Sequence, residues 1–164
     1  MVGRRTPGAP GFTIIELMIV MAVVAVFVTL AVPSMRDMVV ATQVRTAASD
    51  VYSSVILARS EAIKRATNVD VIPNGGDWAQ GWTVKVGATQ IDSHDAPSNV
   101  IITPNNTGNI TYRLDGRLSS NVRNLTLFTT ASTSAIAARC VIIDASGKAT
   151  IRTDTDNNPA NGCN

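Results

Sequence analysis

The chain has 164 residues, of which 45% are hydrophobic and 16% are charged, so it can build one folded domain and is not a largely disordered protein. Fourteen Lys and Arg residues against twelve Asp and Glu residues give a net charge of +2. Arg4 and Arg5 supply that excess, and the rest of the chain carries twelve charges of each sign. This balance argues against a domain whose whole surface is a basic clamp for nucleic acid.

The N-terminal region combines a short polar leader with a long apolar run. Residues 1–11 hold two arginines and then TPGAPG, whose Pro and Gly residues make a poor helix. Residues 12–32 carry a single charge, Glu16, and would form about 31 Å of helix, enough to span a bilayer. The arginines favour a cytoplasmic leader, with the residues after 32 across the membrane. The boundary at Gly11 is a predicted protease site.

Glu16 is the exceptional residue of the apolar run. A carboxylate in lipid costs about 2.5 to 3.5 kcal/mol at the centre of a helix and less toward its end. Cleavage after Gly11 would create an ammonium group on Phe12, one helical turn from Glu16 of the same or a neighbouring subunit. We expect this ammonium group to pair with Glu16. The alternative is a Glu16 side chain that simply reaches the lipid headgroups.

Gly11 followed by FTIIELMIVMAVVAVFVTLAVPS resembles the class III leader and N-terminal helix of type IV pilins and pseudopilins. The resemblance implies cleavage after Gly11 and N-methylation of Phe12 by the prepilin peptidase at the cytoplasmic face of the inner membrane. It implies that the helix then leaves the membrane for a helical filament of other major and minor pilins. Glu16, the fifth mature residue, would contact the N-terminal amine of another subunit, and Pro33 would be the twenty-second.

The remainder of the chain predicts an α+β head. Pro33 should kink the helix, which then continues to about residue 66, because apolar residues recur every three or four positions at Val44, Ala48, Val51, Val55, Ala58 and Ala62. Short β-prone runs follow, separated by turn residues: NVDVI, GWTVKV, NVIIT, NITYRL, NLTLF, RCVIID and ATIRT. We expect the type IV pilin fold, a long N-terminal helix packed on a mainly antiparallel β-sheet.

Three segments are expected: a leader (1–11), a protruding transmembrane and assembly helix (12–38) and a globular head in the periplasm (39–164). ARSEA (58–62) and DWAQGWTVKV (77–86) resemble the signature of the GspH/FimT family of minor pilins. ITYRLDGRLSS and RCVIIDASGKATIRT resemble the later strands of the same family. The resemblance implies a structural subunit, not an enzyme, that primes assembly of a type IV pilus and joins it near the tip. A minor pseudopilin of type II secretion and a DNA-receptor pilin for natural transformation stay open as alternatives.

Cysteine and histidine content limits the chemistry of the head. Cys140 and Cys163 are the only cysteines, and in an oxidising compartment we expect them to form a disulfide. With 22 residues between them, the bridge would stabilise the head by about 3 kcal/mol. The one histidine, His94, stands in a polar stretch read as a loop, which favours neither a zinc site nor a catalytic triad. No metal and no cofactor are expected.

The acidic tail offers a weak calcium pattern. Asp154, Asp156 and Asn158 alternate like the first ligands of a calcium loop, but Pro159 stands where such a loop needs glycine, and no Glu closes it. We expect a solvated tail instead.

Basic residues in the second half of the head could form a patch: Arg113, Arg117, Arg123, Arg139, Lys148 and Arg152. Resemblance to FimT-like pilins suggests a DNA-binding glycine-arginine-x-arginine element near the C-terminus. This chain has SGKAT (146–150) at the matching place, and GRLS (116–119) lacks the second arginine. These departures argue against DNA as a partner. If DNA is bound, Arg117, Lys148 and Arg152 are the predicted contacts.

Overall fold

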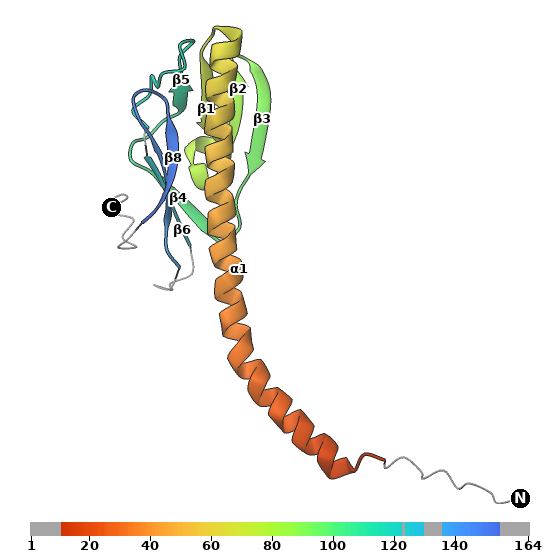
Figure 1. Cartoon of the computed structure of the whole chain (residues 1–164). Coiled ribbons are helices and arrows are strands. Elements are labelled where there is room, and N and C mark those ends of the chain that lie inside the picture. The colour runs from red at the N-terminus through yellow and green to blue at the C-terminus, as the bar shows by residue number, and fades with distance from the viewer. Residues whose placement is uncertain (1–10, 123, 130–135, 155–164) are drawn as a thin grey trace, which may run out of the picture. The chain divides into compact units, whose positions relative to one another are not determined.

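The computed structural model describes residues 11–122, 124–129 and 136–154, without the side chains of residues 30–34, 128 and 129. The chain divides into two compact units between Arg36 and Asp37, close to the start of the head predicted at residue 39. The elements are α1 (Ile14–Arg65), β1 (Val69–Pro73), η1 (Asn74–Gly76), η2 (Trp78–Gln80), β2 (Gly81–Val86), β3 (Thr89–Asp95), β4 (Val100–Pro104), β5 (Ile110–Tyr112), β6 (Asn124–Thr129), β7 (Arg139–Ile143) and β8 (Ala149–Thr153) (Figure 1).

Helix α1 has capped ends. Before its first turn, Oγ1 of Thr13 accepts a hydrogen bond of 3.3 Å from the backbone N–H of Glu16. After its last turn, the N–H of Ala66 donates to the carbonyl of Ile63, and the N–H of Thr67 donates to that of Ala62. This is a Schellman motif, with Ala66 at a φ of 51°. The predicted end of the helix near Arg65 is confirmed.

The backbone of α1 stays helical through Pro33. The helix therefore continues beyond this proline, as predicted. The kink itself stays a prediction.

The head holds two sheets where the sequence pattern suggests one. Every pairing between the named strands is antiparallel, in the orders β3-β2-β1-β5 and β4-β6-β7-β8. The second half of α1 runs along both sheets (Figure 1). The expected α+β class is therefore confirmed, with the β-layer divided in two.

The sequence pattern does not predict β3. This strand forms the edge of its sheet, and its residues TQIDSHD are all exposed or half-buried, so no alternation of large apolar side chains marks it. His94 thus lies in a strand and not in the expected loop. Its Nε2 is 3.2 Å from Oδ2 of Asp92, and its ring stacks on Trp82 with the centroids 5.1 Å apart.

The core of the head lies on one face of α1. The six apolar positions predicted for that face, Val44 to Ala62, are each at most 1% exposed, and Ala47 joins them at 2%. They pack in one cluster with residues of both sheets, among them Val71 and Leu125. Ser54 is buried on the same face, where its Oγ accepts a 2.9 Å hydrogen bond from Nε1 of Trp82. This bond satisfies a buried indole donor that would otherwise destabilise the core.

Candidate assembly surface

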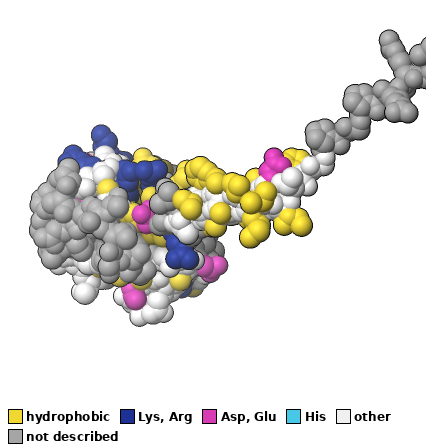
Figure 2. Space-filling view, turned by 90° about the horizontal axis from the view of Figure 1, so that it is seen from below, with side chains coloured by type: hydrophobic (Ala, Val, Ile, Leu, Met, Phe, Trp, Pro, Cys, Tyr) yellow, Lys and Arg dark blue, Asp and Glu magenta, His cyan; other side chains and the backbone are white. Residues whose placement is uncertain are grey.

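The first part of α1 is apolar and uncovered. Phe12 is 85% exposed, and every large apolar side chain from Ile14 to Val28 is at least 48% exposed. Figure 2 shows hydrophobic side chains at the surface along this part of the helix. A helix that is apolar all round is normally buried in protein or lipid. This surface therefore requires a partner, which makes it the candidate functional site.

Within the described part of the chain, no helix meets the length and apolarity that a membrane crossing requires. The run predicted to span the bilayer includes residues 30–34, whose side chains lie outside the described ones. The membrane helix predicted for residues 12–32 therefore stays a prediction.

Glu16 occupies the third position of α1, counted from the capping residue Thr13. Thr13-x-x-Glu16 is the sequence pattern of a capping box, and a carboxylate in the first turn is favoured by the helix dipole. The Glu16 side chain is exposed and forms no ion pair with any described residue. Sequence reasoning gave Glu16 a role in assembly, with contact to the lipid headgroups as the alternative, and missed the cap, although the T-x-x-E spacing carries the signal. The cap fixes the helix start and leaves the carboxylate open to another molecule.

Gly11 has no structural need to be glycine in this chain. A Cβ built on it meets nothing within 4 Å, and its φ is not in the left-handed region. It is exposed and precedes α1 in an irregular segment. A requirement for glycine at this position would therefore come from another molecule, such as a protease that binds the segment.

Arg59, from the ARSEA signature, ties two turns of the head to α1. Its Nε donates to the carbonyl of Gly116 at 3.0 Å, and its Nη2 donates to that of Ser146 at 3.2 Å. The turns touch each other, because a Cβ on Gly147 would lie 2.2 Å from the Gly116 carbonyl oxygen. Tyr112 donates its hydroxyl hydrogen to the Gly147 carbonyl at 3.1 Å, and burial raises the pKa of this phenol. The signature arginine thus stabilises the head.

The rest of the signature also has a local role. Ala58 and Ala62 are fully buried. Glu61 accepts hydrogen bonds from Arg65 and Lys64 one turn further on, and the Arg65 guanidinium holds the pKa of Glu61 below its usual value. These residues therefore stabilise the helix and its packing.

The predicted DNA contacts are only partly brought together. Arg117 and Lys148 are exposed on the two touching turns, but each turn also carries a carboxylate. Asp115 accepts the N–H of Arg117 at 3.1 Å, and Asp144 accepts the N–H of Lys148 at 3.0 Å. The hydroxyl of Ser146 also donates to Asp144 and lowers the pKa of this acid.

Arg152 lies apart from these two residues. It lies within β8, whereas Lys148 precedes that strand, and it pairs across the sheet with Cys140. Arg139 pairs with Thr153 in the next register position, so Arg139 and Arg152 point to opposite faces of the sheet. Arg123 lies outside the described residues. Arg139 and Arg152 therefore do not share one face of this sheet.

The remaining site predictions concern the C-terminal strands. Cys140 is fully buried on β7 and disulfide-bonded, while its predicted partner Cys163 lies outside the described residues, so that pairing stays a prediction. Asp154 is only 2% exposed, and its N–H donates to the carbonyl of Ala138 at 3.0 Å. The expectation of a solvated tail is wrong at this residue, because Asp154 continues the pairing of β8 with the segment before β7.

The two other residues of the calcium pattern, Asp156 and Asn158, lie outside the described ones. Among residues 11–122, 124–129 and 136–154, no three His, Cys, Asp or Glu side chains gather in a way that could hold a metal ion.

Comparison with known proteins gives two family matches and one similar fold. The family model described as type II transport protein GspH matches residues 47–147, and the prokaryotic N-terminal methylation motif matches residues 9–32. Two crystal structures of the type IV minor pilin FimU from Pseudomonas aeruginosa are similar, each with 18% sequence identity. One has a TM-score of 0.60 and covers 75% of this chain and 96% of FimU, and the other has 0.58 and covers 73% and 99%. No curated protein is significantly similar in sequence.

Proposed function

The chain belongs to the GspH family, and we propose that it acts as a minor pilin that primes assembly of a type IV pilus and joins its filament near the tip. The family and the fold are those of structural pilins and pseudopilins. The observation that carries the proposal is the uncovered apolar surface of α1 behind an N-terminal methylation motif. Neighbouring pilin helices would cover this surface in the filament.

The proposed sequence of events begins in the inner membrane. The apolar run holds the chain there, with the leader (1–11) in the cytoplasm and the head (39–164) in the periplasm. The prepilin peptidase cleaves after Gly11 and methylates Phe12. The assembly helix (12–38) then leaves the lipid and packs among other pilins. Two observations support the cleavage step: the match to the methylation motif, and the free space around Gly11, which gives the described structure no steric reason for glycine there.

Glu16 supplies the proposed polar contact of assembly. Its exposed carboxylate lies at the first turn of α1, where the ammonium group of Phe12 from a neighbouring subunit can reach it. In the low dielectric of a helix bundle or a membrane, two such charges need each other as partners. This pairing would set which part of one helix lies beside which part of the next.

Two variants of the full chain test the proposal in pilus-forming cells. Gly11→Val should block maturation, and the mass of the chain should then include the leader; Thr107→Val, in an exposed loop of the head, should mature normally. Glu16→Ala should stay stable in the membrane but enter filaments poorly, whereas Asp37→Ala, which removes another exposed acid from α1, should enter as the parent does. Normal processing of Gly11→Val, or full incorporation of Glu16→Ala, would contradict the proposal.

A minor pseudopilin of type II secretion is the second candidate, favoured by the description of the matching family as a type II transport protein. The same helix and head would then serve a secretion machine. Deletion of the gene separates the two, because loss of surface pili indicates the first role and loss of protein secretion the second. The genes beside it offer an independent criterion, since pilus and secretion operons differ in content.

A further inference from the structure

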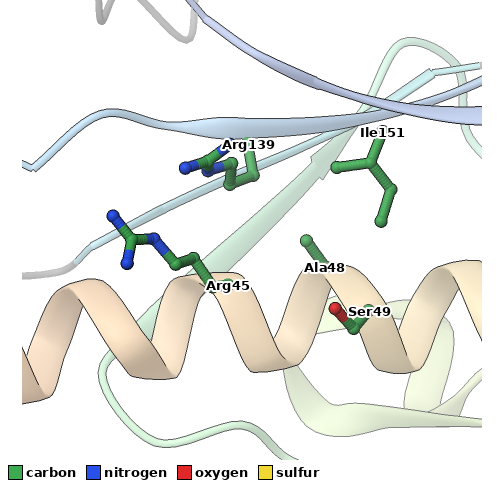
Figure 3. Close-up of a pocket in the computed structure, with 5 residues that line it drawn as sticks. All are labelled: Arg45, Ala48, Ser49, Arg139 and Ile151. Atoms are coloured by element: carbon green, nitrogen blue, oxygen red, sulfur yellow. The ribbon is translucent and has the colours of Figure 1, made fainter.

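A pocket of about 160 Å³ lies in the head beside the second half of α1. Arg45, Ala48 and Ser49 line it from the helix, and Arg139 of β7 and Ile151 of β8 line it from the second sheet. All five residues belong to the same compact unit, 37–164. Figure 3 shows the two guanidinium groups, one from α1 and one from β7, turned toward the same end of the pocket. The pocket therefore combines two positive charges with an apolar wall.

Neither arginine of the pocket has an acidic partner among the described residues. Arg139 is half-buried and donates a hydrogen bond to the hydroxyl of Thr153, which orients its guanidinium. Arg45 is exposed and makes no hydrogen bond within the described part of the chain. Each guanidinium carries five N–H donors, so both groups have donors to offer to an acceptor that comes from outside this part of the chain.

The chemistry of the pocket favours a carboxylate carried on a protein side chain. Guanidinium groups bind carboxylates through paired N–H donors, and one carboxylate can accept hydrogen bonds from two such groups. Ala48 is buried and Ile151 is 39% exposed, so the methylene groups of an Asp or Glu would meet apolar surface beside the charges. A nucleic-acid backbone would instead need further basic groups spaced along a track, and the described residues that line the pocket supply only these two.

The pocket is accessible because it lies at an edge of the second sheet. Strand β8 is the last one in the order β4-β6-β7-β8, and its residues Ile151, Arg152 and Thr153 are exposed. On the helix side of the pocket, Arg45 and Ser49 are exposed as well. A side chain that projects from a neighbouring molecule can therefore reach the two arginines.

We propose that the Arg45–Arg139 pocket binds an Asp or Glu side chain on the head of a neighbouring pilin of a different kind, an inference that rests on the proposed role as a filament subunit. In that role the chain is surrounded by other pilins, so the acid belongs to one of them and not to a second copy of this chain. The two positive charges attract a neighbour that presents a carboxylate and repel one that presents Lys or Arg. The contact thereby selects which pilin lies beside this flank of the head.

Carbodiimide coupling of the full-length chain in pilus-forming cells tests this contact, because the reagent adds no spacer and joins an amine only to a carboxylate that touches it. Arg45→Lys keeps the positive charge of the pocket and introduces the amine. We expect a product in which this amine is joined to an Asp or Glu of another pilin, identified by mass spectrometry of the linked peptides. Arg152→Lys is the matched control, because it places an exposed amine on the other face of β8 and should give no such product.

A second substitution tests whether Arg139 holds the same carboxylate. Adding Arg139→Gln to Arg45→Lys should lower the yield of the product about tenfold, because the carboxylate loses one of its two charged donors. Adding Arg152→Gln instead should leave the yield unchanged. Urea unfolding of each full chain in detergent, followed by tryptophan fluorescence, verifies that the head is folded. An unchanged yield in a folded chain with Arg139→Gln would overturn the two-arginine site.

Incorporation of the chain into sheared filaments is measured in the same cells. Equal yields for Arg45→Lys and Arg152→Lys, or coupling to an acid of the same chain or of a second copy, would overturn the proposed contact. A chain that enters filaments without giving a product with another pilin would also overturn it and leave the proposed function standing. The expected product in the cell envelope from a chain that never enters filaments would support the contact and contradict the filament role.

Discussion

Both halves of helix α1 contain apolar residues, but only those of the second half are buried in the head. Val24 in the first half is 48% exposed, whereas Val55 in the second half is fully buried. The second half sends one face into the core of the head and leaves polar residues on the other. The first half has large apolar residues on all sides. The described part of the chain leaves these side chains largely exposed, so we infer that they serve contacts with other molecules.

Side-chain size separates the halves further. The buried face of the second half includes four alanines, Ala47, Ala48, Ala58 and Ala62. Small residues let the backbone of the helix approach the strands closely, and large neighbours such as Trp82 then fill the space. The first half carries Ile, Leu, Met, Val and Phe, which create broad contact with helices or lipid. A mutation should therefore reveal in which half it lies by whether it changes folding or assembly.

The largest expected effect on stability is at Gly147, where two turns of the head are in close contact. Gly147→Ala would force a φ of +83° on a residue with a Cβ and place that Cβ 2.2 Å from the Gly116 carbonyl oxygen. Strain and overpacking together should lower the free energy of unfolding by about 3 kcal/mol. Urea unfolding of the full chain in detergent, followed by the fluorescence of the buried Trp78 and Trp82, measures it.

Gly87→Ala is the control for that variant, because its φ is also positive, at +57°, but a Cβ there meets nothing within 4 Å. Gly87→Ala should lower the free energy of unfolding by about 1 kcal/mol. Equal losses for the two variants would show that the contact between the two turns has no energetic weight.

A matched pair of valines tests the contrast between the halves directly. Val55→Ala opens a cavity in the core and should lower the free energy of unfolding by about 2 kcal/mol. Val24→Ala removes the same two methyl groups from an exposed site, so the unfolding of the head should not change, whereas entry into filaments should fall. Urea unfolding and the amount of chain in sheared filaments are measured for both. If Val24→Ala destabilised the head as much as Val55→Ala, the functional division of α1 would be wrong.

The hydrogen bonds of Arg59 should contribute less than the core. Arg59→Ala leaves the carbonyls of Gly116 and Ser146 without their charged donor. We expect it to lower the free energy of unfolding by about 1.5 to 2 kcal/mol. Arg65→Ala is the comparison, because among the described residues the Arg65 side chain forms its ion pair with Glu61 alone, at the exposed end of α1, and removing it should lower the free energy of unfolding much less. The midpoints of urea unfolding rank the two. A larger loss for Arg65→Ala would refute the role given to Arg59.

Periodicity predicted those parts of the fold that bury apolar side chains. The buried face of α1, its end near Arg65 and the positions of seven strands follow from spacing and turn residues. Strand β3 could not be predicted, because an edge strand with polar residues is held by backbone hydrogen bonds that leave no pattern in the side chains. The division into two sheets depends on long-range pairing, which local propensity does not contain.

The candidate site, too, could be predicted only in part from the sequence. The apolar run and Glu16 are visible in the sequence because they contradict the chemistry of a water-exposed helix. That Arg45 and Arg139 line one pocket is not visible in the sequence, because it depends on how β7 and β8 lie against α1. Arg59 is prominent as part of a family signature, yet only the structure reveals the two carbonyls that it holds.

The smallest expected effect has the opposite sign and lies where α1 ends. Ala66 closes the helix at a φ of 51°, a conformation that disfavours any residue with a Cβ, while the hydrogen bonds of the Schellman motif hold it there. Ala66→Gly should remove that strain and raise the free energy of unfolding by about 1 kcal/mol. Lys64→Gly, two residues earlier within the helix, should lower it by about 1 kcal/mol, because glycine there loses more backbone entropy. The midpoints of urea unfolding of the two variants should therefore move in opposite directions. Since the packed half of α1 ends at this turn, both variants should enter filaments as the parent does. A shift of both midpoints downward would mean that Ala66 is not strained and that the end of the helix is set by its contacts with the head.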